Sequence, residues 1–124
     1  MSILIGKHIK SVLSGFSKKV TGGIYLEGLN RDTNYPYIIY NYSVQPDAET
    51  KDGSTYNCDV SIIIYSTEGD ASIELAEEVK KRMMESYSEY EEFKITDIEF
   101  SIYRGSHDNG VYTRELEFNI KTTD

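Results

Sequence analysis

TYNCDVSIIIYS (residues 55–66), with TEGD (67–70) and ASIELAEEVKKRMM (71–84) directly after it, is the stretch that decides the fold of this chain. Apolar and polar residues alternate in the first segment, as in a β-strand with one buried face. The end of that segment, residues 62–65, is apolar at every position, which predicts cover on both faces of the strand. The last segment repeats apolar residues at three- and four-residue steps and predicts a helix. A central strand and a helix that packs back over the sheet therefore form the spine of the domain.

Two helices are expected. The spine helix has Thr67 as its expected N-cap, and it ends near residues 84–87 because the acidic run Glu85–Glu92 is unfavourable at a helix C-terminus. Its predicted buried stripe is Ile73, Ala76, Val79, Lys80 and Met83, with Leu75 on the flank. The other helix runs from Ser2, a candidate N-cap, to about Lys18. Its apolar stripe is Ile5, Ile9, Val12, Leu13 and Phe16.

Four further strands are expected around the spine, at residues 24–26, 36–44, 93–103 and 112–120. In the third of these, Ile98, Phe100 and Ile102 are expected on one face. The parity of the apolar residues changes near Thr96-Asp97, which predicts a bulge there.

Two connections are expected to project from the sheet. The polar segment 45–54 lies between two strong strands and contains Asp52-Gly53, so it predicts a long hairpin. The segment 104–110 is expected to be a turn, with Asn109-Gly110 as a pair that accepts positive φ.

The element order is therefore α-β-β-β-α-β-β. This order predicts an α+β fold with two layers, in which an antiparallel or mixed β-sheet of about five strands carries two helices on one face. The length of 124 residues suits a single domain that spans residues 1–124.

Charge and composition limit the function classes. The formal net charge is -8, with 13 basic against 21 acidic residues, whereas binding to nucleic acid needs an excess of Lys and Arg to displace counterions. No apolar run approaches the ~20 residues that cross a bilayer. A single cysteine excludes an internal disulfide. The sequence thus argues against a nucleic-acid or membrane partner.

No set of residues predicts catalysis, a metal site or a cofactor. His8 and His107 are far from any metal-binding spacing, and both are expected to be solvated. Cys58 lies on an alternating strand without a nearby group to lower its pKa, so it is expected to be a buried small hydrophobe. The absence of a nucleophile with a base predicts that the protein is not an enzyme and that its function lies in its surfaces.

Several short stretches, in order, resemble the tail-completion or tail-terminator proteins of tailed bacteriophages and prophages. An opening helix leads into Val20-x-x-Gly23-Ile24-Tyr25, and Pro36-Tyr37-Ile38-Ile39-Tyr40 follows as a strand. The helix 71–82, ASIELAEEVKKR, is similar to the second helix of that family. The closing strand reads Gly110-Val111-Tyr112-x-Arg114-x-Leu116-x-Phe118-x-Ile120.

This resemblance implies a structural subunit of a hexameric ring that caps the tail tube and joins it to the head connector. Its partners would be other copies of itself, the tail-tube protein and head-connector proteins, and its location would be the virion tail after synthesis in the bacterial host cytoplasm. The segments that project from the sheet are expected to be its contact surfaces. The predicted interface residues are Asp47, Glu49, Lys51, Asp52, Arg104, His107 and Asp108.

Two other functions remain open from the residues alone. One is a small acidic adaptor, without catalytic activity, that binds a basic partner protein. The other is an enzyme that uses Cys58 or His107, although no assembled set of residues supports it. Oligomeric state separates the ring from the adaptor.

Overall fold

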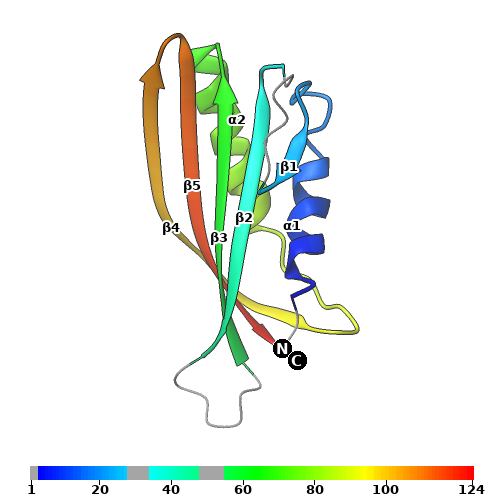
Figure 1. The fold of residues 1–124 in the computed structure, drawn as a ribbon. Helices are drawn as coiled ribbons and strands as arrows, with labels where there is room; N and C mark the ends of the chain where they lie inside the picture. The colour runs from blue at the N-terminus through cyan, green and yellow to red at the C-terminus, as the bar shows by residue number, and fades with distance from the viewer. Residues whose placement is uncertain (1–2, 28–33, 48–54) are drawn as a thin grey trace.

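The computed structural model of this chain describes residues 3–27, 34–47 and 55–124. Along the chain, the elements follow the predicted order α-β-β-β-α-β-β (Figure 1). They are α1 (Ile5–Ser14), β1 (Ile24–Leu26), β2 (Tyr37–Pro46), β3 (Thr55–Ser66), α2 (Gly69–Met84), β4 (Lys94–Asp108) and β5 (Val111–Thr123).

The five strands form one mixed sheet in the order β1-β2-β3-β5-β4. β1 runs parallel to β2, and the other neighbouring pairs are antiparallel. Both helices lie on the same side of the sheet, behind it in the view of Figure 1. We call the side that packs on the helices the helix face and the opposite side the open face. The predicted α+β architecture with two helices on one face is confirmed.

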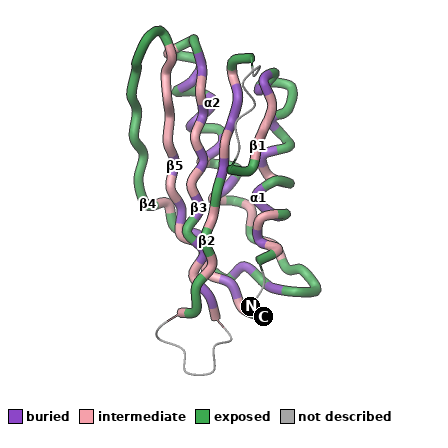
Figure 2. Tube along the Cα trace, in the orientation of Figure 1, coloured by how far each residue is buried: buried purple, intermediate pink, exposed green. Residues whose placement is uncertain are grey.

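The core lies between the helix face and the two helices. Along β3 buried residues alternate with half-buried or exposed ones, coloured purple, pink and green in Figure 2. The buried residues are those of the helix face. This alternation is the one predicted for the spine strand, and it follows from the period of two in an extended chain. The largest fully buried side chains are those of Phe118, Ile5, Ile9, Leu13, Ile38, Ile62, Ile64, Met83, Leu116 and Ile120.

The helix starts differ from those predicted. α1 begins at Ile5 rather than near Ser2, and α2 begins at Gly69 with Glu68 at the N-cap position. Thr67 is therefore not the N-cap. Instead the buried Ser66 hydroxyl oxygen accepts a hydrogen bond from the Glu68 N–H at 3.1 Å and so stabilises the turn from β3 into α2. The predicted end of α2 near Met84 is confirmed.

The buried stripe of α2 is rotated from the predicted one. Ile73 is 51% exposed, whereas Leu75 is 7% exposed and packs in the core. The side chains of α2 that face the sheet and α1 are Ser72, Leu75, Ala76, Val79 and Met83. The prediction that Ile73 is buried is therefore wrong, and Ile73 remains available at the surface.

β4 contains two irregularities. The predicted bulge near Thr96-Asp97 is confirmed, because the register with β5 shifts between Ile95 and Asp97. A second shift, between Phe100 and Ile102, was not predicted. It places Ile102 opposite Glu117 on the open face and Tyr103 opposite Leu116 on the helix face. The prediction that Ile102 shares a face with Ile98 and Phe100 is therefore wrong.

The segment 104–110 is mostly strand rather than turn. β4 continues to Asp108, which pairs directly with Val111. Asn109 and Gly110 make the turn with φ of 51° and 79°, so the predicted positive-φ pair is confirmed. The twist of such a two-residue turn matches that of the strands, which explains the regular pairing from Ile102 to Asp108 next to the turn.

Candidate interaction surfaces

The predicted interface residues lie at opposite ends of the sheet. Asp47 follows β2, where its N–H donates to the Thr55 carbonyl at 3.0 Å. The other end of the sheet contains Arg104, His107 and Asp108. Their partners on β5 pair in turn with the last residues of β3, which ends at Ser66. Glu49, Lys51 and Asp52 lie outside the described residues. The two ends of β3 are about 35 Å apart at the usual rise per residue, so Asp47 and the β4 residues do not form one site within a chain.

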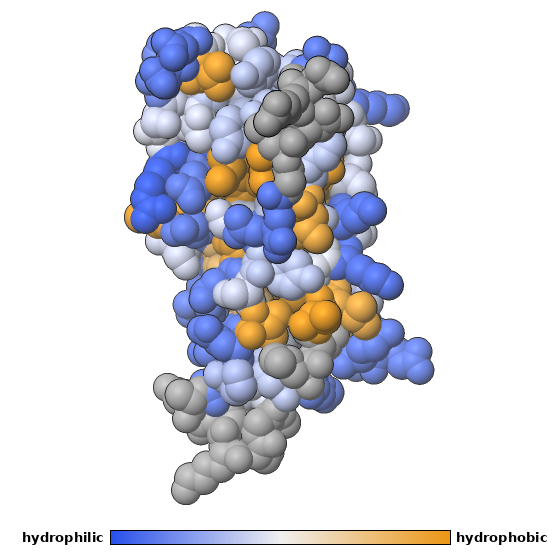
Figure 3. Space-filling model, in the orientation of Figure 1, coloured by the Kyte–Doolittle hydropathy of each residue, from blue (hydrophilic) through white to orange (hydrophobic). Residues whose placement is uncertain are grey.

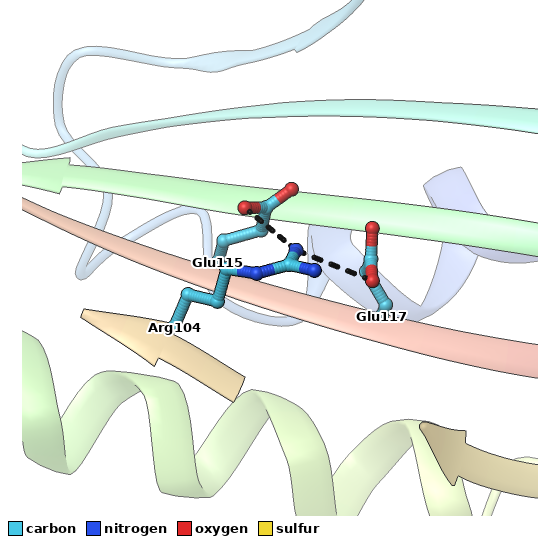
Figure 4. Close-up of polar contacts among 3 residues, drawn as sticks. All are labelled: Arg104, Glu115 and Glu117. Atoms are coloured by element: carbon cyan, nitrogen blue, oxygen red, sulfur yellow. Dashed lines mark hydrogen bonds and ion pairs between the residues drawn. The ribbon is translucent and has the colours of Figure 1, made fainter. Parts of the chain in front are cut away.

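Arg104 belongs to a charged cluster on the open face (Figure 4). Its Nη1 lies 3.4 Å from Glu115 Oε1 and 3.4 Å from Glu117 Oε2. Glu115 and Glu117 are two residues apart on β5 and therefore point to the same side, and Arg104 lies opposite Glu115 on β4. The arginine is 56% exposed, so solvent weakens both ion pairs. The cluster is a pair of solvent-screened ion pairs across the two strands of the hairpin.

His107 and Asp108 occupy the end of the β4–β5 hairpin. The His107 ring lies against the Tyr112 ring with centroids 4.4 Å apart, and both His107 and Asp108 are exposed. The expectation of a solvated His107 is confirmed. These residues offer polar and aromatic contact area to another molecule.

The open face carries polar side chains along its central part. Asn41, Ser43, Asp59, Ser61 and Glu117 line a shallow groove of about 640 Å³ there. In Figure 3, which views this face, hydrophobic residues appear in patches between hydrophilic ones. Among the described residues no group of three or more His, Cys, Asp or Glu side chains is arranged to hold a metal ion. The groove is thus a solvated, acidic part of the surface.

A second groove, of about 380 Å³, lies between α2 and β4 on the helix-face side. It is more apolar than the open-face groove, and Tyr103 enters it because of the second register shift in β4. Within the groove lining, the Lys80 ammonium lies 4.6 Å from the centre of the Phe100 ring. The residues that line the groove are Ile73, Ala76, Glu77, Lys80, Phe100, Tyr103 and Leu116. Sequence reasoning missed this groove because its residues come from three elements.

Cys58 and His107 do not form a catalytic pair. Cys58 is fully buried on the helix face of β3, and burial raises the pKa of its thiol to about 11, so the reactive thiolate is scarce at neutral pH. Its β5 partner is Ile120, whereas His107 pairs with Tyr112, eight residues away along the same strand. The two side chains are therefore about 25 Å apart along the sheet. The expectation of a buried, hydrophobic Cys58 is confirmed.

His8 is buried, which corrects the expectation that it is solvated. It is 3% exposed, its Nε2 lies 3.0 Å from Ser86 Oγ, and its Nδ1 lies 2.7 Å from the Tyr90 hydroxyl. The Ser86 hydroxyl donates its proton to the Met83 carbonyl, so its oxygen accepts from His8 Nε2–H. Nδ1 then accepts from Tyr90. A neutral imidazole satisfies every partner and ties α1 to the segment after α2.

We expect acid to destabilise the fold through His8. Burial lowers the pKa of His8 below its usual 6.5, so the unfolded chain takes up the proton first as pH falls. The contribution of neutral His8 is complete above pH 6.5 and is lost as the pH falls from there through the folded-state pKa. Urea unfolding of wild type and His8→Gln at pH 7, 6 and 5 measures this, because the carboxylates are common to both chains.

The wild type is expected to lose more free energy of unfolding than His8→Gln over that range. His107→Gln serves as the matched control, since His107 is exposed, and should keep the wild-type pH dependence. Equal pH slopes for wild type and His8→Gln would contradict the prediction.

Comparison with known proteins places the fold. No protein-family model matches the sequence, and no curated protein matches it. Among solved structures, a chain of the virion of a native gene transfer agent particle superposes with a TM-score of 0.78 at 12% identity, over 94% of this chain and 92% of that one. The gp17 protein of bacteriophage SPP1 superposes with a TM-score of 0.52 at 16% identity, over 98% of this chain and 88% of that one.

This chain has the fold of both proteins. The likeness extends over most of the length of this chain and of both solved structures. Within the described residues, no helix is both long enough and apolar enough to span a membrane. The α+β fold that the order of elements predicted is thus shared with two solved structures.

Proposed function

We propose that this chain is a structural tail-completion protein of a phage or prophage. Copies of it form a ring of six that caps the tail tube and joins it to the head connector. The observation that carries this proposal is the fold shared with a chain of a gene transfer agent virion over 94% of the length. Its partners are other copies, the tail-tube protein and head-connector proteins, and its place is the virion tail after synthesis in the host cytoplasm.

The surface chemistry supports a role in assembly rather than in catalysis. The buried Cys58 thiol and the exposed His107 ring lie about 25 Å apart along the sheet, so they supply no nucleophile with an adjacent base. A net charge of -8 fits a ring that DNA passes without adhering, because like charges repel. A ring structure with a basic lumen would contradict this last point.

Two measurements test the proposal. Light scattering behind a sizing column, over a range of concentrations, is expected to give a mass six times the 14.2 kDa of one chain. The protein is also expected to sediment together with purified tail tubes of the same particle that were assembled without it. The matched control is the same mixture with tubes already completed by the wild-type ring.

The results separate the ring from the acidic adaptor. Sedimentation with incomplete tubes but not with completed tubes supports tail completion, whatever the mass of the free chain. A monomer that does not bind incomplete tubes would overturn the proposal and favour the adaptor.

A further inference from the structure

A row of five side chains crosses the helix face from one edge of the sheet to the other. The strand register aligns Leu26 with Tyr40, Tyr40 with Ile62, Ile62 with Leu116 and Leu116 with Tyr103. The three inner members are buried, at 4%, 0% and 1% exposure. The two outer members are not: Leu26 is 48% exposed and Tyr103 is 42% exposed. The apolar row therefore ends, uncovered, at both edges of the sheet.

At the β4 edge the row ends in the apolar groove between α2 and β4. Tyr103 and Ile73 both line this groove, and Ile73 is itself 51% exposed although isoleucine is usually buried. The groove offers about 380 Å³, enough for an aliphatic side chain and the backbone next to it. It is an apolar recess with Glu77 and Lys80 in its lining.

At the other edge the row ends in Leu26 on the short strand β1. β1 and β4 are the two outer strands of the sheet, and Figure 1 shows them on opposite sides of the molecule, with α1 next to β1 and α2 behind β3. A residue of one edge cannot reach the groove at the other edge of the same chain. It can reach the groove of a second copy.

The β1–α1 edge is basic. Residues 1–26 include four lysines and no acidic residue, and of these Lys7, Lys10 and Lys18 are exposed on or after α1. The groove at the other edge has Glu77 and Lys80 in its lining, whereas Glu74 and Glu78 line a separate recess together with Lys19. Lys19 and Glu78 form an ion pair there, at 2.6 Å. Glu77 is therefore the groove carboxylate that a lysine of a second copy can approach.

The strand directions also allow this contact. β1 runs parallel to β2, and three antiparallel pairings then lead across the sheet to β4. β1 is therefore antiparallel to β4. When two copies stand side by side in the same orientation, the β1 of one lies antiparallel to the β4 of the next, which is the arrangement of a continuing sheet.

We propose that copies dock head to tail, with the β1–α1 edge of one against the α2–β4 edge of the next and Leu26 in the groove beside Tyr103 and Ile73. The occupant of the groove is thus a second copy of this chain. Because the two surfaces differ, the contact is heterologous and generates a ring when the rotation closes. This inference rests on the proposed ring and assigns the surfaces that build it.

Complementation between two variants tests the docking. Leu26→Asp damages only the β1 edge, and Tyr103→Asp damages only the groove, so each variant alone is expected to lower the mass from six chains to one. A mixture of the two retains one intact pair of surfaces, the groove of Leu26→Asp and the Leu26 of Tyr103→Asp. The mixture is therefore expected to form a dimer of twice 14.2 kDa and no ring.

Two controls show that the variants act through the contact. Ile102→Asp introduces the same charge next to Tyr103 but on the open face, and it should keep the wild-type mass. Circular dichroism and thermal unfolding of Leu26→Asp and Tyr103→Asp should show a folded chain, because both side chains are partly exposed.

The outcomes separate this inference from the proposed function. Variants that keep the mass of the wild-type ring overturn the docking, while binding to incomplete tail tubes still supports tail completion. Variants that keep the ring mass but lose binding to the tubes assign the edge to the tube protein and also overturn the docking. A wild-type chain that stays monomeric at its highest soluble concentration overturns it too. Two folded monomeric variants that form a dimer only when mixed support it.

Discussion

Ile62→Ala is expected to lower the free energy of unfolding by about 2–5 kcal/mol, the usual cost of truncating a buried isoleucine to alanine. Ile62 is 0% exposed and stands at the centre of the row that crosses the helix face, between Tyr40 and Leu116. Its neighbours are held in strands by ladder hydrogen bonds on both sides. They cannot move in to fill the space, so the lost contacts are added to the lost transfer free energy.

Ile73→Ala is the matched control, because it removes the same atoms from a side chain that is 51% exposed. It is expected to cost less than about 1 kcal/mol in the folded monomer. Urea unfolding of the two variants, at a concentration where the chain is monomeric, gives both values. A similar cost for Ile62 and Ile73 would contradict the described core, and an Ile73→Ala ring as stable as wild type would remove Ile73 from the proposed contact.

The contrast between Ile62 and Ile73 also shows which parts of the fold can be predicted from the sequence. The strand 55–66 has a period of two that fits a single arrangement, so its buried face could be predicted from the sequence. The helix that follows has apolar residues on more than one side, namely Ile73, Leu75 and Ala76. Ile73 and Leu75 flank Ala76 on opposite sides of the helix. Periodicity identifies the helix but not which of the two flanking side chains faces the sheet.

The second register shift in β4 could not be predicted from the sequence for a related reason. Ser101 is a small polar residue in an alternating run, so nothing local shows that the strand gains one residue there. The shift is visible only against β5, where Phe118 pairs with Phe100 and Glu117 with Ile102. Without it Ile102 and not Tyr103 would lie in the groove. The buried His8 was missed likewise, because Ser86 and Tyr90 are distant in sequence.

The candidate surfaces were predicted only in part. Turn chemistry correctly located Asn109-Gly110 and hence the exposed hairpin end with His107 and Asp108. It said nothing about the edges of the sheet, because strand order is a property of long-range pairing. Leu26 and Tyr103 become two ends of one row only when the order β1-β2-β3-β5-β4 is known. The interface role of the seven predicted residues stays a prediction.

Gly22→Ala is expected to lower the free energy of unfolding by about 3 kcal/mol, near the upper part of the usual range for overpacking. The Gly22 N–H donates to the Pro36 carbonyl at 2.8 Å, and Ile38 N–H donates to the Gly23 carbonyl at 3.0 Å. These bonds bring β1 alongside β2. A Cβ on Gly22 would overlap the Asn34 carbonyl oxygen, and backbone atoms cannot rotate away as the end of a side chain can.

Gly110→Ala is the matched control, because it separates lack of space from backbone conformation. Gly110 has a φ of 79°, but a Cβ there meets no atom within 4 Å. Its cost is the strain of a left-handed alanine, about 1 kcal/mol. Urea unfolding of both variants should therefore place Gly22→Ala well below Gly110→Ala in stability. Equal free energies of unfolding for the two variants would contradict the prediction, because the backbone at Asn34 would then have moved to accommodate the added Cβ.

Gly22→Ala is expected to affect assembly as well as stability. If Gly22→Ala moves β1 away from β2, it also moves Leu26 out of the row that ends at Tyr103. We then expect the folded fraction of Gly22→Ala to form rings less readily than wild type in light scattering, while Gly110→Ala keeps the wild-type mass. A Gly22→Ala chain that is destabilised but assembles normally would mean that β1 need not be held in register for docking, and the row across the helix face would lose its role in the contact.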